Sequence, residues 1–206
     1  MILIGRNMSP FVRRTSTVMR LLGIEFEQRF LATAEAVGEI KKFNPLGRVP
    51  ALVLDDGEIL IDSSAIIDFL IDTYDPSGTL MSKSGARRRG VLRTTAIAHG
   101  VMEKGVASSY EKTRRSEEKV SEEWLDYVNA QVEQGLNELE RIAVASVEWL
   151  HGENITIADV TAICAFDYIL TRHPALAEKS NFDALRKLSL RGNAMDAFKK
   201  TQHKEK

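Results

Sequence analysis

The run from Asn44 to Phe69, NPLGRVPALVLDDGEILIDSSAIIDF, changes its local structure unusually often for its length. It holds, in order, a loop ending in Val49-Pro50, two short apolar segments joined by an Asp-Gly turn, and a helix start at Asp62-Ser63-Ser64. Because Asp-Gly tolerates the positive φ angles of a tight turn, segments 51–54 and 59–61 are predicted to be antiparallel strands. We interpret the run as a pocket for a small anionic ligand, which the rest of the chain supplies with a reactive group.

The composition sets limits on the rest of the chain. Its 206 residues, 44% hydrophobic and 28% charged, suit one large folded domain or two small ones. With 28 basic and 29 acidic residues, the net charge of −1 gives no overall electrostatic case for nucleic acid or an acidic membrane. The single cysteine, Cys164, favours a reducing compartment. No run approaches the roughly 20 apolar residues of a membrane span, and the start lacks a signal-peptide pattern, so a cytoplasmic protein is predicted.

The first part of the chain is predicted to be a mixed sheet with helices. Ser9-Pro10 opens an amphipathic helix that ends near Gly23. Its arginines are assigned to the polar face: Arg13, Arg14 and Arg20. The predicted order is βαβ followed by αββα, with a strand at 1–5, a helix at 9–23, a strand at 25–31, a weaker helix at 34–43, strands at 51–54 and 59–61, and a helix at 63–74.

The second part is predicted to be all helical. Turn-forming residues at 77–85 indicate a linker, and helical periodicity then covers 86–112, 117–145 and 157–170. The last helix is apolar nearly all round, which places it at the centre of a bundle, and Thr156 with Asp159 has capping-box spacing at its start. The polar tail after Lys199 is expected to fray. One face of the second helix is predicted to be buried, through Trp124, Val128, Val132, Leu136, Leu139 and Ala143.

Four motifs follow one another along the chain: SPFVR at 9–13, NPLGRVPAL at 44–52, DSSAI at 62–66 and TIAD at 156–159. With the predicted elements, they resemble the cytosolic glutathione transferases, and the SPFVR form resembles a group of bacterial glutathione transferase-like proteins. The resemblance implies a thioredoxin-like glutathione-binding domain at 1–76, a linker at 77–85 and an all-helical bundle domain at 86–206. It also implies a homodimer that conjugates glutathione, as co-substrate, to a small hydrophobic electrophile in detoxification.

The resemblance assigns glutathione to the central run. Val49 would offer its N–H and C=O to the cysteinyl part of the tripeptide, and the bond between Val49 and Pro50 would be cis. Ser63, at a helix start, would bind the γ-glutamyl carboxylate, because the positive end of a helix favours an anion. Asp62 would pair with the ligand's ammonium, and Arg48 would approach the glycyl carboxylate.

Ser9 is the predicted catalytic residue. A free thiol titrates near pH 8.5, and a hydroxyl that donates to the sulfur at a helix N-terminus would stabilise the thiolate. One pKa unit of lowering takes about 1.4 kcal/mol, which such a hydrogen bond and the helix end can supply together. The thiolate would attack an electrophile lying against Phe11 and the helix from His99 to Tyr110.

Each assignment has an alternative. Ser-Pro is also a common helix start, with Ser9 as N-cap and Pro10 at the first helical position, and Asp62 and Ser63 can likewise be only caps. The alternative function is a non-catalytic glutathione-binding or protein-interaction module. A third interpretation is a glutathione-dependent reductase or isomerase.

One position departs from the family pattern. Many members carry an acidic residue just before a glycine on the first helix of the second domain, and it reaches the γ-glutamyl end of glutathione across the dimer interface. Here His99 precedes Gly100, with Glu103 one turn on. Either His99 changes that contact or Glu103 takes it over.

The remaining polar residues predict no further site. The short basic runs at 87–89 and 114–115 are interpreted as solvated helix faces rather than a nucleic-acid site. The histidines and Cys164 lack metal-ligand spacing, so no metal is predicted, and Cys164 is assigned to the inert core. Thioredoxin-type disulfide chemistry would need a cysteine where Ser9 stands and is disfavoured.

Overall fold

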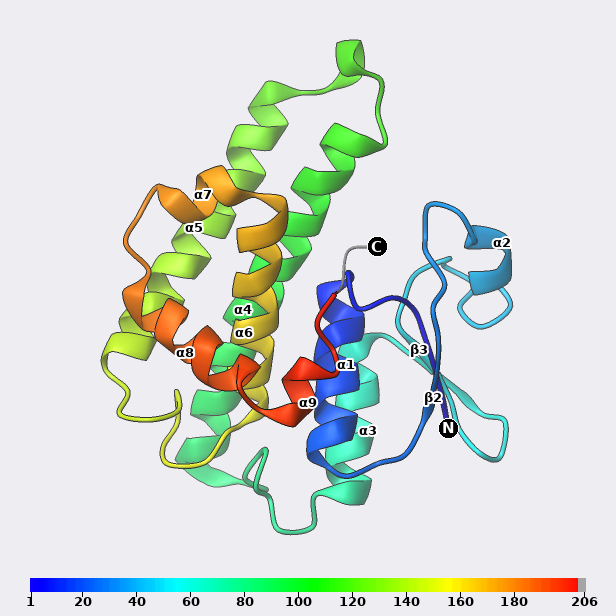
Figure 1. The fold of residues 1–206 in the computed structure, drawn as a ribbon, viewed down its shortest axis with the longest axis vertical. Helices are drawn as coiled ribbons and strands as arrows, with labels where there is room; N and C mark the ends of the chain where they lie inside the picture. Colours follow the sequence, from blue (N-terminus) through cyan, green and yellow to red (C-terminus); the bar gives the residue numbers. More distant parts are fainter. Residues whose placement is uncertain (204–206) are drawn as a thin grey trace. The chain divides into compact units, whose positions relative to one another are not determined.

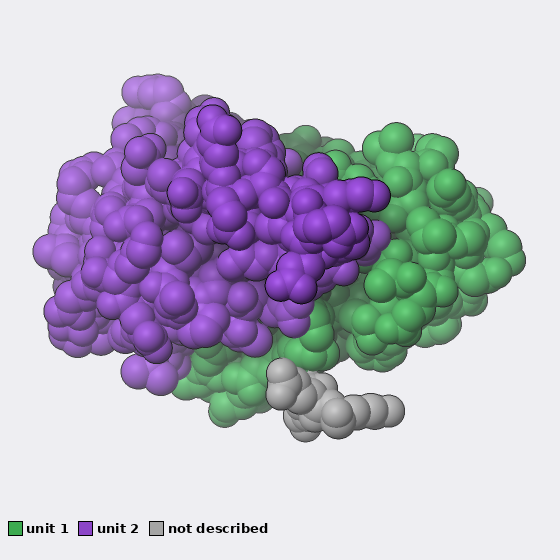
Figure 2. Space-filling model, turned by 90° about the horizontal axis from the view of Figure 1, so that it is seen from above, with its two compact units in different colours: residues 1–81, 193–206 green, residues 82–192 purple. Residues whose placement is uncertain are grey.

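A computed structural model describes residues 1–203 of the chain. By their contacts the residues form two compact units, coloured separately in Figure 2. Unit 1 is Met1–Met81 together with the residues from Asn193 on, and unit 2 is Ser82–Gly192. The predicted domain boundaries and linker stay a prediction.

Unit 1 is built on a four-stranded sheet. The strands are β1 (Ile2–Ile4), β2 (Glu27–Arg29), β3 (Ala51–Val53) and β4 (Ile59–Ile61), in the order β2-β1-β3-β4. β1 and β2 are parallel, whereas β1 with β3 and β3 with β4 are antiparallel. The Asp-Gly turn thus joins antiparallel neighbours, as predicted from the sequence.

Among residues 1–203, four helices accompany this sheet. They are α1 (Pro10–Leu21), α2 (Val37–Ile40), α3 (Ser63–Tyr74) and the C-terminal α9 (Asp196–Lys199). α1 and α3 pack side by side on one side of the strands, and α2 lies on the other (Figure 1). The arrangement is a thioredoxin-like fold and confirms the predicted order of elements, although α2 is shorter than the predicted helix at 34–43.

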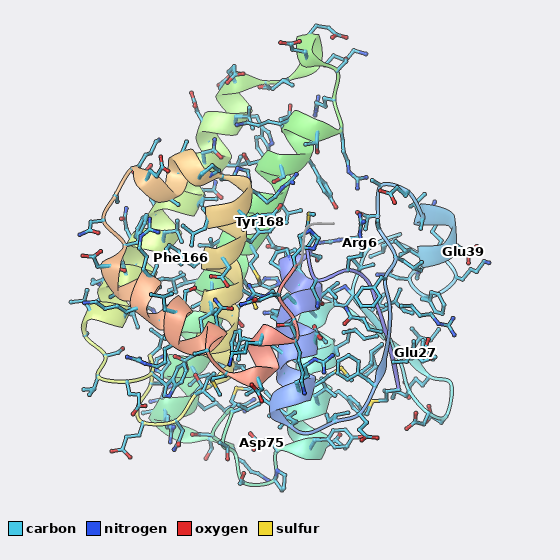
Figure 3. All side chains as sticks on the ribbon, in the orientation of Figure 1. Arg6, Glu27, Glu39, Asp75, Phe166 and Tyr168 are labelled. Carbon is cyan, nitrogen blue, oxygen red and sulfur yellow. The ribbon has the colours of Figure 1, made fainter. Side chains whose placement is uncertain are left out.

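Short-range polar contacts set the helix ends in unit 1. Pro10 stands at the first position of α1, where its missing N–H costs no helical hydrogen bond. At the C-terminal end of α3, buried Asp75 (Figure 3) accepts hydrogen bonds from the N–H groups of Thr79 (2.9 Å) and Leu80 (2.8 Å). The first residues after α3 are therefore an ordered turn held by one carboxylate.

Unit 2 is helical. Its elements are α4 (Gly85–Thr113), the 3₁₀ turn η1 (Glu117–Lys119), α5 (Glu122–Val144), α6 (Ile157–Arg172), α7 (Pro174–Glu178) and α8, which begins at Asp183 and ends at Asn193. α4 packs on both α5 and α6 (Figure 1). Glycines allow this close approach: a Cβ at Gly105 would lie 2.6 Å from Ile169, and one at Gly135 would lie 2.4 Å from Val101.

The capping box at the start of α6 is present as predicted. The N–H and the hydroxyl of Thr156 donate to Asp159 Oδ2 at 2.8 and 2.7 Å, and the N–H of Leu150 donates to Oδ1 at 2.7 Å. Burial raises the pKa of the Asp159 carboxyl, and these hydrogen bonds oppose the rise. α6 itself is buried along most of its length, which confirms its predicted place at the centre of the bundle.

Two packing predictions were wrong. Trp124 is 43% exposed, and the neighbouring Leu125, 3% exposed, takes its place on the buried face of α5. The tail does not simply fray after Lys199, because Thr201 is fully buried and its hydroxyl lies 3.0 Å from that of Thr17 in α1. Residues 204–206, on which the rest of that prediction falls, lie outside the described residues.

Candidate functional site

Three loops of unit 1 meet at one end of the sheet. The strand register places Ile4 opposite Ala51, and Ala51 opposite Ile61. The residues that follow β1, precede β3 and follow β4 are therefore neighbours at this end. The predicted site residues Ser9, Val49 and Asp62 belong to these loops or lie at their ends, so the fold gathers residues that are far apart in the sequence.

Gly5 brings the first two loops into contact. Its φ of +127° suits glycine, and a Cβ there would lie 2.6 Å from Val12 and 2.9 Å from Val49. The side-chain amide of Gln28 supports the same loop, since its Nε2 donates to Gly5 O and to Asn7 Oδ1, both at 2.9 Å. The loop that leads to Ser9 is thus held directly beside Val49.

In the loop before β3, the backbone N–H and C=O of Val49 remain available to a ligand. The bond between Val49 and Pro50 is cis, as predicted. Val49 is half-buried, and its backbone N–H and C=O form no hydrogen bond within residues 1–203. Asn44 fixes the loop by donating through Nδ2 to Arg48 O at 2.9 Å, while the Arg48 side chain is exposed and forms no hydrogen bond or ion pair with the described residues.

Asp62 combines a cap with an unusual backbone. It is the N-cap of α3, and its Oδ1 accepts a hydrogen bond from the Ser64 N–H at 2.8 Å. Its φ of +61° with ψ of +139° is sparsely populated for a residue with a side chain. The capping alternative is therefore realised, but a cap does not require this conformation, and strained backbone tends to occur at functional sites.

Ser63 contacts an arginine that was predicted to lie on the polar face of α1. Arg14 is only 1% exposed and donates to Ser63 Oγ through Nε at 3.1 Å and Nη2 at 2.8 Å. The predicted polar face of α1 was wrong for both Arg14 and Arg13, because Arg13 is 7% exposed. The signal was in the spacing: Arg14 lies three residues after Phe11 and four before Val18, both of which are buried.

Ser9 is the helix N-cap that the alternative assignment described, and its hydroxyl can still donate a hydrogen bond. It is the N-cap of α1, where its Oγ accepts from the Val12 N–H at a long 3.4 Å, and its own N–H donates to Arg6 O at 3.0 Å. The side chain is half-buried, and its hydroxyl proton has no acceptor in the described part of the chain. A hydroxyl can accept from a backbone N–H and donate elsewhere at the same time, so capping does not exclude catalysis.

The residues predicted to contact a second substrate belong to different units. Phe11, in α1, is 8% exposed. In α4, His99 is half-buried, Glu103 is exposed, and Tyr110 is 42% exposed with the Arg114 guanidinium 4.1 Å from its ring centre. The second-substrate wall and the choice between His99 and Glu103 stay predictions.

A buried cluster in unit 2 was missed by sequence reasoning. Ser109 Oγ lies 2.9 Å from both the Tyr168 hydroxyl (Figure 3) and His173 Nε2, and the same nitrogen lies 2.8 Å from Gly105 O. A carbonyl oxygen only accepts, so Nε2 carries the proton and cannot serve as a base for Ser109. Burial lowers the pKa of His173. The cluster joins α4 to the end of α6 and has a structural role.

The basic run at 87–89 and Cys164 agree with their structural interpretation. Within the basic run at 87–89, Arg87 and Arg89 are exposed, and Cys164 is buried. Over residues 1–203, no three His, Cys, Asp or Glu side chains are grouped closely enough to hold a metal ion. In the same range, no helix combines the length and apolar character needed to cross a membrane.

Comparison with known proteins identifies the family. The model "Glutathione S-transferase, N-terminal domain" matches residues 3–78, and "Glutathione S-transferase, C-terminal domain" matches residues 120–190. This chain belongs to the glutathione S-transferase family. The family predicted from the sequence motifs is thereby confirmed.

Individual relatives cover most of the length of this chain. The uncharacterized GST-like protein YibF of Escherichia coli is 29% identical over 84% of each chain. A maleylacetoacetate isomerase of Pseudomonas aeruginosa is 31% identical over 71% of each chain. Among solved structures, a glutathione S-transferase of Methylobacillus flagellatus with GSH bound is 28% identical, with a TM-score of 0.88 over 97% of this chain and 98% of the other.

Proposed function

We propose that this chain binds glutathione at the end of the sheet where the three loops of unit 1 meet, and that it activates the thiol of glutathione. Val49 hydrogen-bonds the cysteinyl part through its backbone, and Asp62 pairs with the ammonium of the γ-glutamyl part. Ser63 donates to the γ-glutamyl carboxylate at the start of α3, where the helix dipole favours an anion. Arg48 binds the glycyl carboxylate.

One observation carries this proposal: groups with unused hydrogen-bonding capacity converge at one end of the sheet. The backbone of Val49, the second carboxylate oxygen of Asp62 and the hydroxyl proton of Ser63 have no partner in residues 1–203. Asp62 is exposed, but Val49 is half-buried and Ser63 is buried. Buried polar groups without partners are unfavourable, and a ligand with complementary groups would satisfy those of Val49 and Ser63. The Methylobacillus flagellatus relative, whose structure holds GSH, supports glutathione as that ligand.

In the proposed reaction, the Ser9 hydroxyl donates a hydrogen bond to the glutathione sulfur. This interaction favours the thiolate over the thiol and lowers the thiol pKa from about 8.5 toward neutrality. The thiolate then attacks a carbon of a small hydrophobic electrophile, and the new C–S bond forms as the leaving group of the electrophile departs with the electron pair of the broken bond. Phe11 is the residue of unit 1 proposed to contact this electrophile. The proposal includes action in the cytoplasm as a homodimer. In this dimer, His99 or Glu103 contacts the γ-glutamyl end of the glutathione bound to the partner subunit.

A second function is favoured by one relative. The Pseudomonas aeruginosa protein, 31% identical, is a maleylacetoacetate isomerase. In an isomerase, the thiolate would add to an unsaturated keto acid and leave again, so that glutathione is not consumed. Analysis of the products separates the two reactions, because conjugation consumes one glutathione per product. The non-catalytic alternative predicts binding with neither reaction.

The experiment that tests the site is calorimetric titration with glutathione. Ser63→Ala should weaken binding by about 1–3 kcal/mol, the scale for losing a hydrogen bond to a charged group. Asp62→Ala should have an effect of the same size. Unchanged affinity in both variants would refute the site.

A further inference from the structure

The side chain of Arg14 lies behind the start of α3. It reaches from α1 and is almost fully buried. Two of its nitrogens, Nε and Nη2, donate to Ser63 Oγ at 3.1 and 2.8 Å, and Nη2 also donates to Ser64 Oγ at 2.7 Å. Burying a guanidinium is costly unless its N–H groups are hydrogen-bonded. Both serines of the helix start are therefore fixed by one buried cation.

These contacts determine what the Ser63 hydroxyl can do. A hydroxyl has one proton to donate and two lone pairs that accept. The two N–H groups of Arg14 occupy the accepting side of Ser63 Oγ, so its proton must point away from the guanidinium. No acceptor for that proton exists in the part of the chain that the structure describes, although Ser63 is 1% exposed. A buried donor without an acceptor indicates a ligand that supplies one.

We infer that Arg14 is a positioning residue that makes the Ser63 hydroxyl an obligate donor to the ligand's α-carboxylate. This inference rests on the glutathione site proposed above. In the absence of such a contact, a serine hydroxyl can turn and accept from an amine or amide as readily as it donates. The two N–H groups that Arg14 donates to Ser63 Oγ prevent the hydroxyl from turning, and the guanidinium places a positive charge behind the anion site. It thereby selects ligands that present a carboxylate, and Ser63 is the group that touches it.

Calorimetry with two ligands tests the inference. The ligands are glutathione and γ-aminobutyryl-cysteinylglycine, which lacks the α-carboxylate but keeps the amine on that carbon and is otherwise the same. Arg14→Met should weaken glutathione by about 10- to 100-fold, the equivalent of one hydrogen bond to a charged group. It should leave the affinity of the analogue unchanged. Arg14→Met and Ser63→Ala should be strongly non-additive in the double variant, since both act on one contact.

Arg13 provides a matched control. It is a buried arginine next to Arg14 on the same helix, but its Nη2 donates to Asn193 Oδ1 at 2.7 Å. Arg13→Met should leave the ratio of the two affinities unchanged. Should Arg14→Met not fold, Arg14→Lys, which keeps the charge but loses the guanidinium, must still reduce the affinity for glutathione relative to that for the analogue.

The possible failures are distinguishable. A wild-type chain that binds neither ligand would overturn the proposed function, and this inference with it. Wild-type binding combined with an equal loss for both ligands in the Arg14 variants would show a merely structural role and overturn the inference alone. Unchanged affinities in those variants would do the same.

Discussion

Because of the backbone conformation of Asp62, one substitution there should affect the stability of the chain and its affinity for glutathione in different ways. Its φ of +61° costs a residue with a side chain about 1–3 kcal/mol. Asp62→Gly removes that cost but adds backbone freedom worth about 0.5–1 kcal/mol to the unfolded chain. Replacing the N-cap by glycine costs only about a few tenths of a kcal/mol more. The variant should therefore range from equally stable to about 2 kcal/mol more stable than the wild type.

The same substitution should weaken glutathione binding. Loss of the carboxylate that pairs with the ammonium is worth about 1.5–3 kcal/mol, or roughly 10- to 150-fold in Kd. Thermal unfolding and calorimetric titration measure the two effects, and a chain of this size shifts its Tm by about 2–4 °C per kcal/mol. A variant that is no less stable than the wild type but binds glutathione more weakly would show that the backbone conformation of Asp62 serves the ligand.

Two further variants complete the test. Asp62→Asn keeps the cap and tolerates positive φ, so it should preserve stability and lose affinity, because only the charge is removed. Asp62→Ala keeps the strain and loses the cap, and it should be less stable by about 1 kcal/mol. If Asp62→Gly were clearly destabilised, the strain argument would be refuted. If its affinity were unchanged, the assigned role of Asp62 would be refuted.

Ser9→Ala should retain glutathione binding but lose the thiolate absorbance that appears on binding near neutral pH; an unchanged absorbance would leave Ser9 as a cap only. Asp159→Ala should destabilise the chain by at least about 3 kcal/mol in urea unfolding, because it leaves the buried N–H groups of Leu150 and Thr156 unsatisfied. The conservative Asp159→Asn should cost less. Burial lowers the pKa of His173 in the folded chain. As the pH falls, the unfolded chain therefore binds a proton at His173 before the folded chain does, and stability should fall as pH drops below about 6.5. His173→Gln should reduce that slope, and an identical slope would contradict the assignment.

Much of the fold could be predicted because its signals are local. The Asp-Gly turn, the Ser-Pro helix start and the capping box of Thr156 and Asp159 each act within a few residues, where steric limits and short hydrogen bonds decide the backbone. The motifs also predicted the family correctly. Local signals failed where packing decided the outcome, as for Trp124, which periodicity placed in the core and the structure leaves exposed.

The central run from Asn44 to Phe69 shows the same division within the candidate site. The sequence alone determined its strands, its turn, the helix start and the residues Val49, Asp62 and Ser63 as binding candidates. Only the tertiary structure decided that Arg14 lies behind Ser63 and that Gly5 lies against Val49. The spacing of an arginine on a helix reports its face but not the partner that covers it. A contact 49 residues apart in sequence exists only because α1 and α3 pack against each other.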